Sequence, residues 1–282
     1  TRPVALVDPA AFKAANMVFS KALKDHPVSG QGLPTYGTAV LVNILHEIGG
    51  LPTRNFTSGQ CDHHDMISGE HMYETIVARG GEPTHGCSLG CIIQCSQVYN
   101  DKDGKYLTSG FEYETIWAYG ADCLINNLDL IAECDNVMDD LGVDSIETPV
   151  MFGVAMEAGL LKFGDGTEVL RMLREEIGKA TPLGRILGGG TAMVGKTYGV
   201  ARVPVVKGQA IPAYDPRSVK GIGVTYATTT QGADHTAGYA VATNVLNVGG
   251  KVDPLSNVGQ VELSRNLQIA TVDDSDFLHL GE

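Results

Sequence analysis

Three features that each mark a class of protein are missing from this sequence. It contains no run of 18 or more apolar residues, which excludes a transmembrane helix of the usual length. Residues 1–8 lack the apolar segment of a signal peptide and start without methionine, so we expect a processed end or the edge of a longer protein. Basic residues are scarce, since 20 Lys and Arg stand against 33 Asp and Glu for a net charge of -13. Such an acidic chain is a poor partner for nucleic acid or for an anionic membrane surface.

Cysteine is also sparse. Six cysteines in 282 residues are too few for a disulfide scaffold. Three of them, Cys87, Cys91 and Cys95, nevertheless follow one another at a regular spacing, which indicates a metal site in a reducing compartment. We therefore expect a cytoplasmic protein.

Apolar residues recur mainly at helical steps of three and four. This period covers residues 9–24, 36–50, 128–141 and 167–179. Regular alternation of apolar and polar residues, which is typical of a half-buried strand, is scarce outside residues 198–206. The sequence therefore predicts a mainly α, multi-helical fold.

The composition changes near residue 205. Beyond this point glycine, proline, threonine and alanine become frequent, and the helical periodicity weakens. We expect a domain boundary there. A helical domain that carries the clustered cysteines would occupy residues 1–205, and part of a second helical domain would occupy residues 206–282.

The three clustered cysteines are the sharpest chemical signal. Steps of four residues advance about 40° beyond a helical turn, so thiolates spaced in this way can gather on one side of a turn or helix. An iron–sulfur cluster needs such converging thiolates. Zinc is the competing metal, although no fourth Cys or His stands at a matching spacing nearby. The alternative without a metal is a set of small side chains packed in the core.

Several further motifs occur in a fixed order along the chain. Together with the cysteines they resemble the aldehyde:ferredoxin oxidoreductase family, whose members carry a tungsten–pterin centre and a [4Fe–4S] cluster. The resemblance extends over almost the whole chain and corresponds to the second and part of the third domain of that family. The motifs that carry it are Leu51-Pro52-Thr53-Arg54-Asn55-Phe56, Tyr113-Glu114-Thr115, Asp139-Asp140-Leu141-Gly142-Val143-Asp144, Ala213-Tyr214-Asp215-Pro216-Arg217, Gly223-Val224-Thr225-Tyr226-Ala227-Thr228 and Gly232-Ala233-Asp234-His235-Thr236.

The resemblance implies four ligands to the iron–sulfur cluster, three of them clustered and one distant. The family's usual gaps are two residues and then three, whereas both gaps here are three. Either Cys87, Cys91 and Cys95 are all ligands, which we favour, or the first ligand position falls on Thr84. The distant position falls on His279, which either ligates the cluster as imidazole does in Rieske centres or marks a diverged tail; we favour the second interpretation.

The resemblance also implies two acidic motifs that bind pterin. Asp139, Gly142 and Asp144 match the first, and Asp274 belongs to the nearest match for the second. Carboxylates accept hydrogen bonds from the N–H groups of a pterin, and glycine permits the tight turn that presents them. Without the neighbouring motifs, the same acids would be interpreted as solvated groups at the end of a helix.

Two residues match the family's catalytic positions. Glu114 corresponds to the glutamate near the metal that acts as general acid or base, and His235 corresponds to the histidine that approaches the substrate oxygen. A carboxylate that loses its water near a metal can be tuned for proton transfer. Taken singly, an exposed acidic pair and a structural histidine would be the more common explanations.

Two other patterns are weaker. Residues 190–197 fit the phosphate-loop pattern, but helical periodicity precedes them where a buried strand is required. A polar loop also contains possible zinc ligands without a standard spacing, namely Cys61, His63, His64, Asp65 and His71.

The resemblance implies the oxidation of an aldehyde to a carboxylic acid at a tungsten or molybdenum bis-pterin, with electrons passing through a [4Fe–4S] cluster to ferredoxin. The chain would then be a fragment or subunit that is inactive alone and needs an N-terminal β-domain or a partner subunit, and it could form a homodimer. The alternative is a non-catalytic iron–sulfur or assembly module that needs a partner chain.

Overall fold

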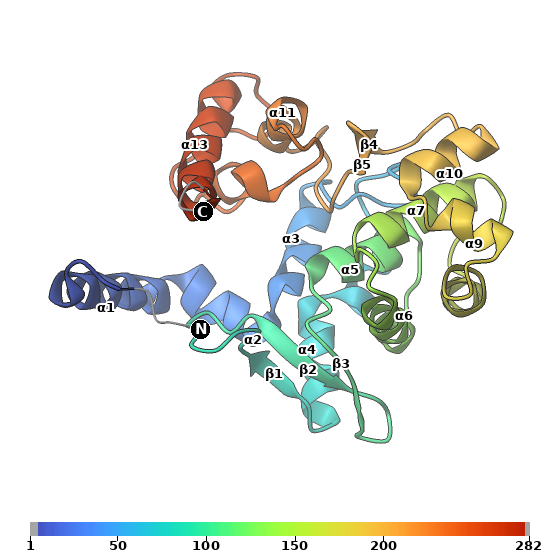
Figure 1. Ribbon diagram of the computed structural model, residues 1–282, viewed down its shortest axis with the longest axis horizontal. Helices are drawn as coiled ribbons and strands as arrows, with labels where there is room; N and C mark the ends of the chain where they lie inside the picture. The colour runs from blue at the N-terminus through green and yellow to red at the C-terminus, as the bar shows by residue number, and fades with distance from the viewer. Residues whose placement is uncertain (1–4, 280–282) are drawn as a thin grey trace.

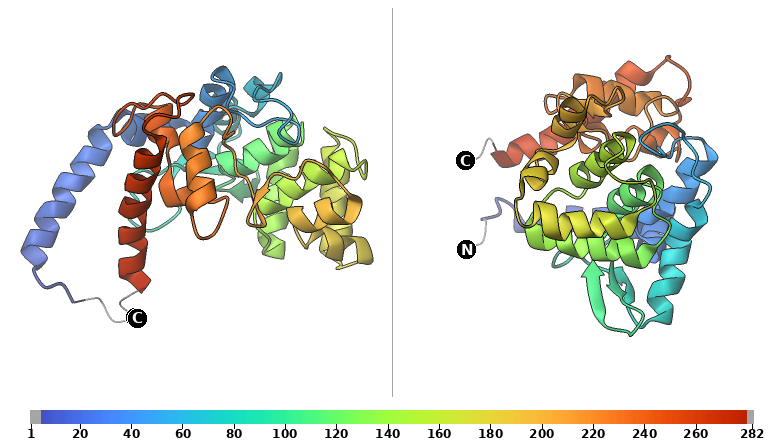
Figure 2. Two further views of the ribbon diagram at one scale, coloured as in Figure 1. Left: turned by 90° about the horizontal axis from the view of Figure 1, so that it is seen from above. Right: turned by 90° about the vertical axis from the view of Figure 1, so that its right-hand side faces the viewer.

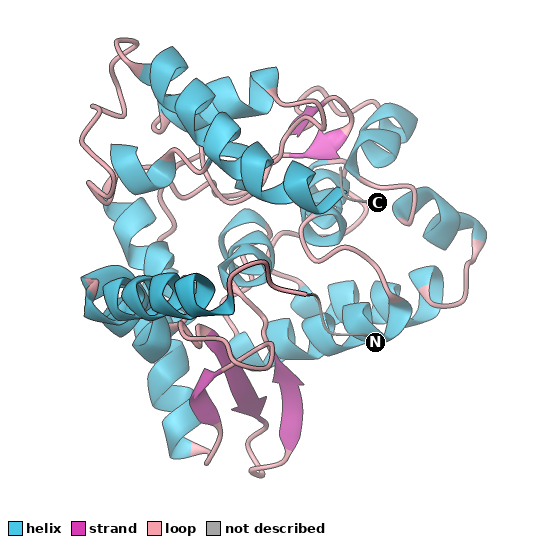
Figure 3. Ribbon diagram, turned by 60° about the vertical axis from the view of Figure 1, so that its left-hand side comes forward, coloured by secondary structure: helices cyan, strands magenta, loops and turns pink. Residues whose placement is uncertain are grey.

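A computed structural model describes the backbone of residues 5–279 and the side chains of residues 5–271. Helices dominate the described part of the chain, and two small antiparallel sheets complete it (Figures 1 and 3). The mainly α fold is therefore confirmed. The helices are α1 (Pro9–Asp25), α2 (Leu33–Tyr36), α3 (Leu41–Glu47), α4 (Gly69–Ala78), α5 (Tyr113–Trp117), α6 (Leu128–Leu141), α7 (Glu147–Glu157), α8 (Gly166–Met172), α9 (Pro182–Leu187), α10 (Thr191–Tyr198), α11 (Lys220–Thr228), α12 (Val241–Asn244) and α13 (Gln260–His279), and the strands are β1 (Glu82–His85), β2 (Ser96–Asn100), β3 (Tyr106–Ser109), β4 (Val205–Val206) and β5 (Gln209–Ala210).

Helix α1 begins where the sequence indicates. The side chain of Asp8 accepts hydrogen bonds from the backbone N–H groups of Ala10 and Ala11, which caps the helix, and Pro9 occupies its first position. Against the described part of the chain, however, α1 buries none of its residues. It projects from the body of the molecule (Figure 2).

The helix expected over residues 36–50 is interrupted. Gly37 ends α2 with φ +62°, and a Cβ at this position would approach the carbonyl oxygen of Cys95 to 3.0 Å. Only glycine therefore brings the chain this close to the cysteine loop. A short 3-10 turn, Thr38–Val40, then leads into α3.

The sequence did not predict the three-stranded sheet β1-β2-β3. Its strands have only four or five residues, too few for a clear period of two. Strand β2 pairs antiparallel with both neighbours, and helices α2, α4 and α6 pack against the sheet. The alternation at 198–206 is a strand only at Val205–Val206.

One hydrophobic core holds the helices together. Trp117, Tyr119 and Phe152 are fully buried in it, and so is Val241 from beyond residue 205. The core therefore contains residues from both sides of the expected domain boundary, which stays a prediction. In residues 5–279, no helix combines the length and apolar character needed to cross a bilayer.

Candidate active site

Glu114 lies in the first turn of α5, and this turn is held by a hydroxyl from a distant part of the chain. Thr38 Oγ1 accepts a hydrogen bond from the backbone N–H of Tyr113 at 2.8 Å and donates one to Glu112 Oε2 at 2.5 Å. The hydroxyl satisfies an N–H group at the start of the helix, where no helical partner exists. Thr38 thereby fixes the backbone that carries Glu112 and Glu114.

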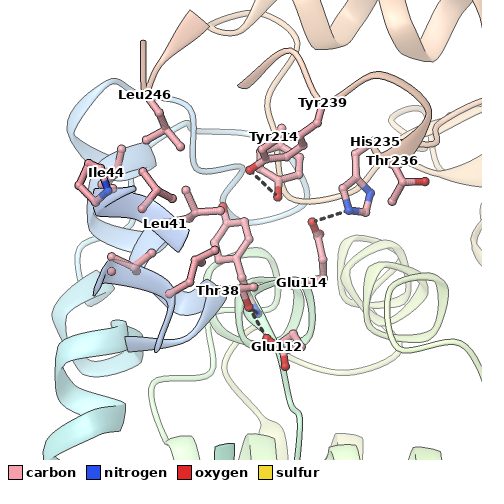
Figure 4. A pocket seen from close by; sticks show the side chains of 16 residues that line it. Thr38, Leu41, Ile44, Glu112, Glu114, Tyr214, His235, Thr236, Tyr239 and Leu246 are labelled. Carbon is pink, nitrogen blue, oxygen red and sulfur yellow. Dashed lines mark hydrogen bonds and ion pairs between the residues drawn. The ribbon is translucent and has the colours of Figure 1, made fainter. Parts of the chain in front are cut away.

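The Glu114 carboxylate joins two segments that are far apart in the sequence. Its Oε2 accepts a hydrogen bond from the backbone N–H of Ala213 at 2.9 Å, and its Oε1 lies 3.4 Å from Nε2 of His235 (Figure 4). The hydroxyl of Tyr113 donates to the carbonyl of Ala213 at 2.9 Å, so two hydrogen bonds connect α5 to that segment. The side chains of Glu114 and His235 are only 14% and 19% exposed.

Burial raises the pKa of Glu114, because the charged carboxylate loses hydration. The positive charge available on His235, the N–H of Ala213 and the hydroxyl of Tyr214 all oppose this shift. The carboxyl group therefore holds a proton more tightly than an exposed glutamate does, which suits a residue that accepts a proton.

Aromatic rings hold His235 in place. The rings of Tyr214 and Tyr239 lie with their centroids 5.5 Å and 6.4 Å from that of the imidazole. Tyr239 also donates a hydrogen bond to the Tyr214 hydroxyl at 3.2 Å (Figure 4). The imidazole therefore has a fixed orientation toward Glu114.

Two cavities meet at His235. The first has a volume of about 590 Å³, contains Glu114 and Glu112, and is otherwise lined largely by apolar side chains such as Leu41 and Ile44 (Figure 4). The second, of about 530 Å³, is more polar and contains Asp144, Glu147, Lys207 and Asp234. His235 thus stands between an apolar chamber and a polar one, and both volumes are in the range of small-molecule sites.

The predicted pterin motif lies at a helix junction beside the polar cavity. Gly142 ends α6 in the left-handed conformation with φ +65°. Asp139 is exposed, and Asp144 Oδ1 accepts hydrogen bonds from the N–H groups of Ile146 and Glu147 at 2.9 and 2.6 Å. Asp144 therefore both stabilises the start of α7 and lines the polar cavity. The side chain of Asp274 lies outside the described residues.

The three clustered cysteines lie in the loop between β1 and β2 rather than on a helix. Cys87 is exposed, while Cys91 and Cys95 are half-buried. Burial raises the pKa of Cys95, and the nearby charges of Glu112, Cys87 and Cys91 raise it further. Three thiols in one loop are the donor type that an iron–sulfur cluster uses, but in residues 5–271 they do not stand together as a ready metal site. The side chain of His279 lies outside the described residues.

Comparison with known proteins decides the family. The family model described as "Aldehyde ferredoxin oxidoreductase, domains 2 & 3" matches residues 14–275. The chain belongs to this family. It is 39% identical over 246 residues to the tungsten-containing aldehyde ferredoxin oxidoreductase of Thermococcus kodakarensis and 37% identical over 246 residues to that of Pyrococcus furiosus. Each match covers 82% of this chain and 40% of the relative, so the chain spans well under half the length of these curated relatives.

Two weaker sequence patterns gain no support from membership of the aldehyde ferredoxin oxidoreductase family. These are the possible zinc ligands in the polar loop and the phosphate-loop pattern at residues 190–197. Within residues 5–271, no three His, Cys, Asp or Glu side chains stand in an arrangement that holds a metal ion, and this applies both to the polar loop and to the loop of Cys87, Cys91 and Cys95. Burial raises the pKa of Cys61 to about 11, as expected of a thiol packed in the core. The element that precedes the phosphate-loop pattern is helix α9, where that motif requires a strand.

Sequence reasoning missed two residues that shape the site, Thr38 and Tyr239. Thr38 and Tyr239 carry no pattern of their own, because their contacts depend on how distant segments pack. Glu112 was visible beside Glu114, and burial also raises its pKa.

Proposed function

We propose that this chain forms the helical part of an enzyme that oxidises an aldehyde to a carboxylic acid at a tungsten bis-pterin, with molybdenum as the alternative metal, and passes electrons to ferredoxin. The observation that supports this most strongly is the pairing of Glu114 with His235 in a cavity, in a chain whose relatives are named tungsten-containing aldehyde ferredoxin oxidoreductases.

The oxidation consumes one water and releases two protons and two electrons for each aldehyde. Glu114 accepts a proton as the aldehyde carbon gains its second oxygen, because its carboxyl group is buried and its proton affinity is raised. His235 donates a hydrogen bond to the substrate oxygen and orients it toward Glu114. The apolar wall of the cavity keeps bulk water from competing for these groups.

The family resemblance supplies the candidate residues for the cofactors. Asp144 offers a carboxylate at the edge of the polar cavity beside His235, and Asp139 and Gly142 complete its motif. Cys87, Cys91 and Cys95 would hold the [4Fe–4S] cluster, with His279 at the position of the fourth ligand. When bound, the bis-pterin metal supplies the two-electron oxidation, and the cluster supplies one-electron transfer to ferredoxin.

The test is to produce the chain under anaerobic conditions with tungstate, both alone and joined to the parts of the Thermococcus kodakarensis relative that lie outside the match. The joined protein should contain tungsten and about four irons, and it should oxidise aldehydes with ferredoxin as acceptor. Iron without tungsten, and no aldehyde oxidation, would instead support a non-catalytic iron–sulfur module.

A further inference from the structure

The charges that line the 590 Å³ cavity are unbalanced. Glu112 and Glu114 bring two carboxyl groups into it, and no Lys or Arg stands among the described residues that line it. His235 is the one lining side chain in this part of the structure that can become positive. A carboxylate in such largely apolar surroundings has lost water that would otherwise stabilise its charge. The cavity therefore favours a ligand that brings a positive charge.

One carboxylate oxygen in the cavity is also left without a donor. Oε2 of Glu114 accepts a hydrogen bond from the N–H of Ala213 at 2.9 Å. Its Oε1 is buried and has no hydrogen-bond partner in the described part of the chain, although Nε2 of His235 lies 3.4 Å away. Buried polar atoms normally have a partner, so this oxygen points to a ligand that supplies a donor or a positive charge.

Three tyrosines meet in the wall of the same cavity. The centroid of the Tyr214 ring lies 5.7 Å from that of Tyr113, with the planes at 50°, and 5.4 Å from that of Tyr239, with the planes at 81°. Rings inclined in this way form a corner rather than a flat stack. Hydrogen bonds from Tyr113 to the carbonyl of Ala213 and from Tyr239 to the hydroxyl of Tyr214 hold it in place. Several aromatic rings around one space are the usual binding site of a quaternary ammonium group.

We propose that the cavity selects an aldehyde that carries a quaternary ammonium group close to its carbonyl. The carbonyl oxygen would lie at His235, and the ammonium group would lie among the tyrosine rings, where the carboxylates of Glu112 and Glu114 attract it. The aldehyde part of this inference rests on the proposed function. The cation part rests on the charges and rings of the cavity, so the two parts can be tested separately.

The test compares two probes of the same shape, choline and 3,3-dimethylbutan-1-ol, which differ in having a charged nitrogen or a neutral carbon at one position. Both are titrated into the full chain by calorimetry at physiological salt. Choline should bind the wild-type chain about tenfold more tightly than the neutral alcohol, as expected for a cation desolvated among aromatic rings. Equal affinity for the two probes would overturn the proposal.

Paired variants separate the cavity from the general attraction of a cation to a chain of net charge -13. Glu112→Gln and Glu82→Gln each remove one negative charge, but the side chain of Glu82 is 65% exposed and lies outside the cavity. The preference for choline should fall about three- to tenfold in Glu112→Gln and stay unchanged in Glu82→Gln. An equal preference in these two variants would place the cation elsewhere and contradict the proposal.

A second pair tests the rings, so that the result does not depend on one variant's folding. Tyr239→Leu removes a ring of the corner, whereas Tyr106→Leu removes a ring that is 63% exposed and lies outside the cavity. The preference for choline should fall about three- to tenfold in Tyr239→Leu alone. The same preference in both variants would contradict a role of the tyrosine corner.

Failure of this inference can be distinguished from failure of the proposed function, because the titrations require neither metal nor turnover. A preference for choline in a chain whose joined form oxidises no aldehyde would support the cation site and contradict the proposed function. Aldehyde oxidation by the joined protein, together with equal binding of choline and the neutral alcohol, would support the proposed function and contradict the cation site.

Discussion

The Glu114–His235 cavity and the cysteine loop between β1 and β2 are built in opposite ways. The cavity is assembled from α3, α5 and the segment around His235, which lie far apart in the chain and are joined by hydrogen bonds. The loop is a single local segment in which Cys87 is exposed, and within residues 5–271 its three thiols do not form an arrangement that could hold a metal ion. Packing of distant segments therefore positions Glu114 and His235, whereas the positions of the three thiols depend on one local loop.

This contrast predicts different responses to mutation. A change in the loop should affect metal content and leave stability nearly intact, because few buried contacts depend on it. A change near Glu114 should affect proton transfer or stability and leave iron bound. The following experiments test this division from the largest expected effect to the smallest.

Cys91→Ser should abolish the cluster. Serine is a much poorer ligand for iron than a thiolate because its hydroxyl stays protonated at neutral pH, so iron content should fall from about four atoms per chain toward zero after anaerobic reconstitution. Iron and sulfide analysis measures this directly. Ser88→Ala, in the same loop, is the control and should retain iron. Full iron content in Cys91→Ser would show that the thiol is not a ligand.

Glu114→Gln should lower the rate of aldehyde oxidation by about 10²- to 10⁴-fold in the joined, metal-loaded protein, because it removes the proton acceptor and keeps the shape. Steady-state kinetics with ferredoxin measures the rate, and metal analysis should show unchanged iron and tungsten. Glu82→Gln changes a carboxylate that is 65% exposed and should keep the wild-type rate. A Glu114→Gln protein with full activity would remove Glu114 from the mechanism.

Asp122→Asn should change how stability depends on pH. Asp122 is fully buried, its Oδ1 accepts from the N–H of Phe56 at 3.2 Å, and its Oδ2 has no hydrogen-bond partner in the described part of the chain. Burial raises its pKa from 3.8 to about 8. Between these values the folded chain keeps a proton that the unfolded chain has lost, so the free energy of unfolding falls as pH rises from about 4 to about 8.

Asparagine at position 122 keeps the acceptor and has no charge, so Asp122→Asn should remove this part of the decline. At pH 8 the variant should be more stable than the wild-type chain by on the order of 3 kcal/mol. Urea unfolding at pH 6, 7 and 8 measures the difference, with exposed Asp103 changed to Asn as control. Parallel pH curves for Asp122→Asn and the wild-type chain would contradict a buried, protonated Asp122.

Thr38→Val should have the smallest effect. It removes the acceptor for the Tyr113 N–H and the donor to Glu112, so the free energy of unfolding should fall by about 1–3 kcal/mol. Thr38→Ser keeps the hydroxyl and should restore most of the loss. Thr35→Val removes a surface hydroxyl bond and should change stability by about 0.5 kcal/mol or less. Equal losses in Thr38→Val and Thr35→Val would show that the hydroxyl does not hold α5.

The sequence predicted elements whose signals are local. Helix α6 follows the predicted bounds because a capping Asn127, a regular apolar face and a terminal Gly142 all agree. The helix expected over residues 36–50 breaks at Gly37, where the approach of the cysteine loop decides the conformation. No local sequence pattern predicts that approach. The short sheet that carries the loop was not predicted either, because its strands are too short to show a clear period.

The residues of the candidate site also differ in whether a local sequence pattern predicts them. The spacing of the cysteines is visible in the sequence because one loop contains them. The proximity of Glu114 and His235 follows from the packing of α5 against the segment at Ala213, so no spacing rule connects the two residues. From the sequence, only the family resemblance predicted that Glu114 and His235 belong to one site.

The most direct test of the account is the titration of the Glu114 carboxyl carbon by NMR, in the wild-type chain and in His235→Asn. Since burial raises the pKa of Glu114 and His235 opposes the rise, the wild-type carboxyl group should titrate above the usual range of glutamate, and the His235→Asn variant should titrate higher still. A wild-type midpoint near 4.5 that does not respond to His235→Asn would contradict the claim that this chain builds an acid–base pair at the cavity.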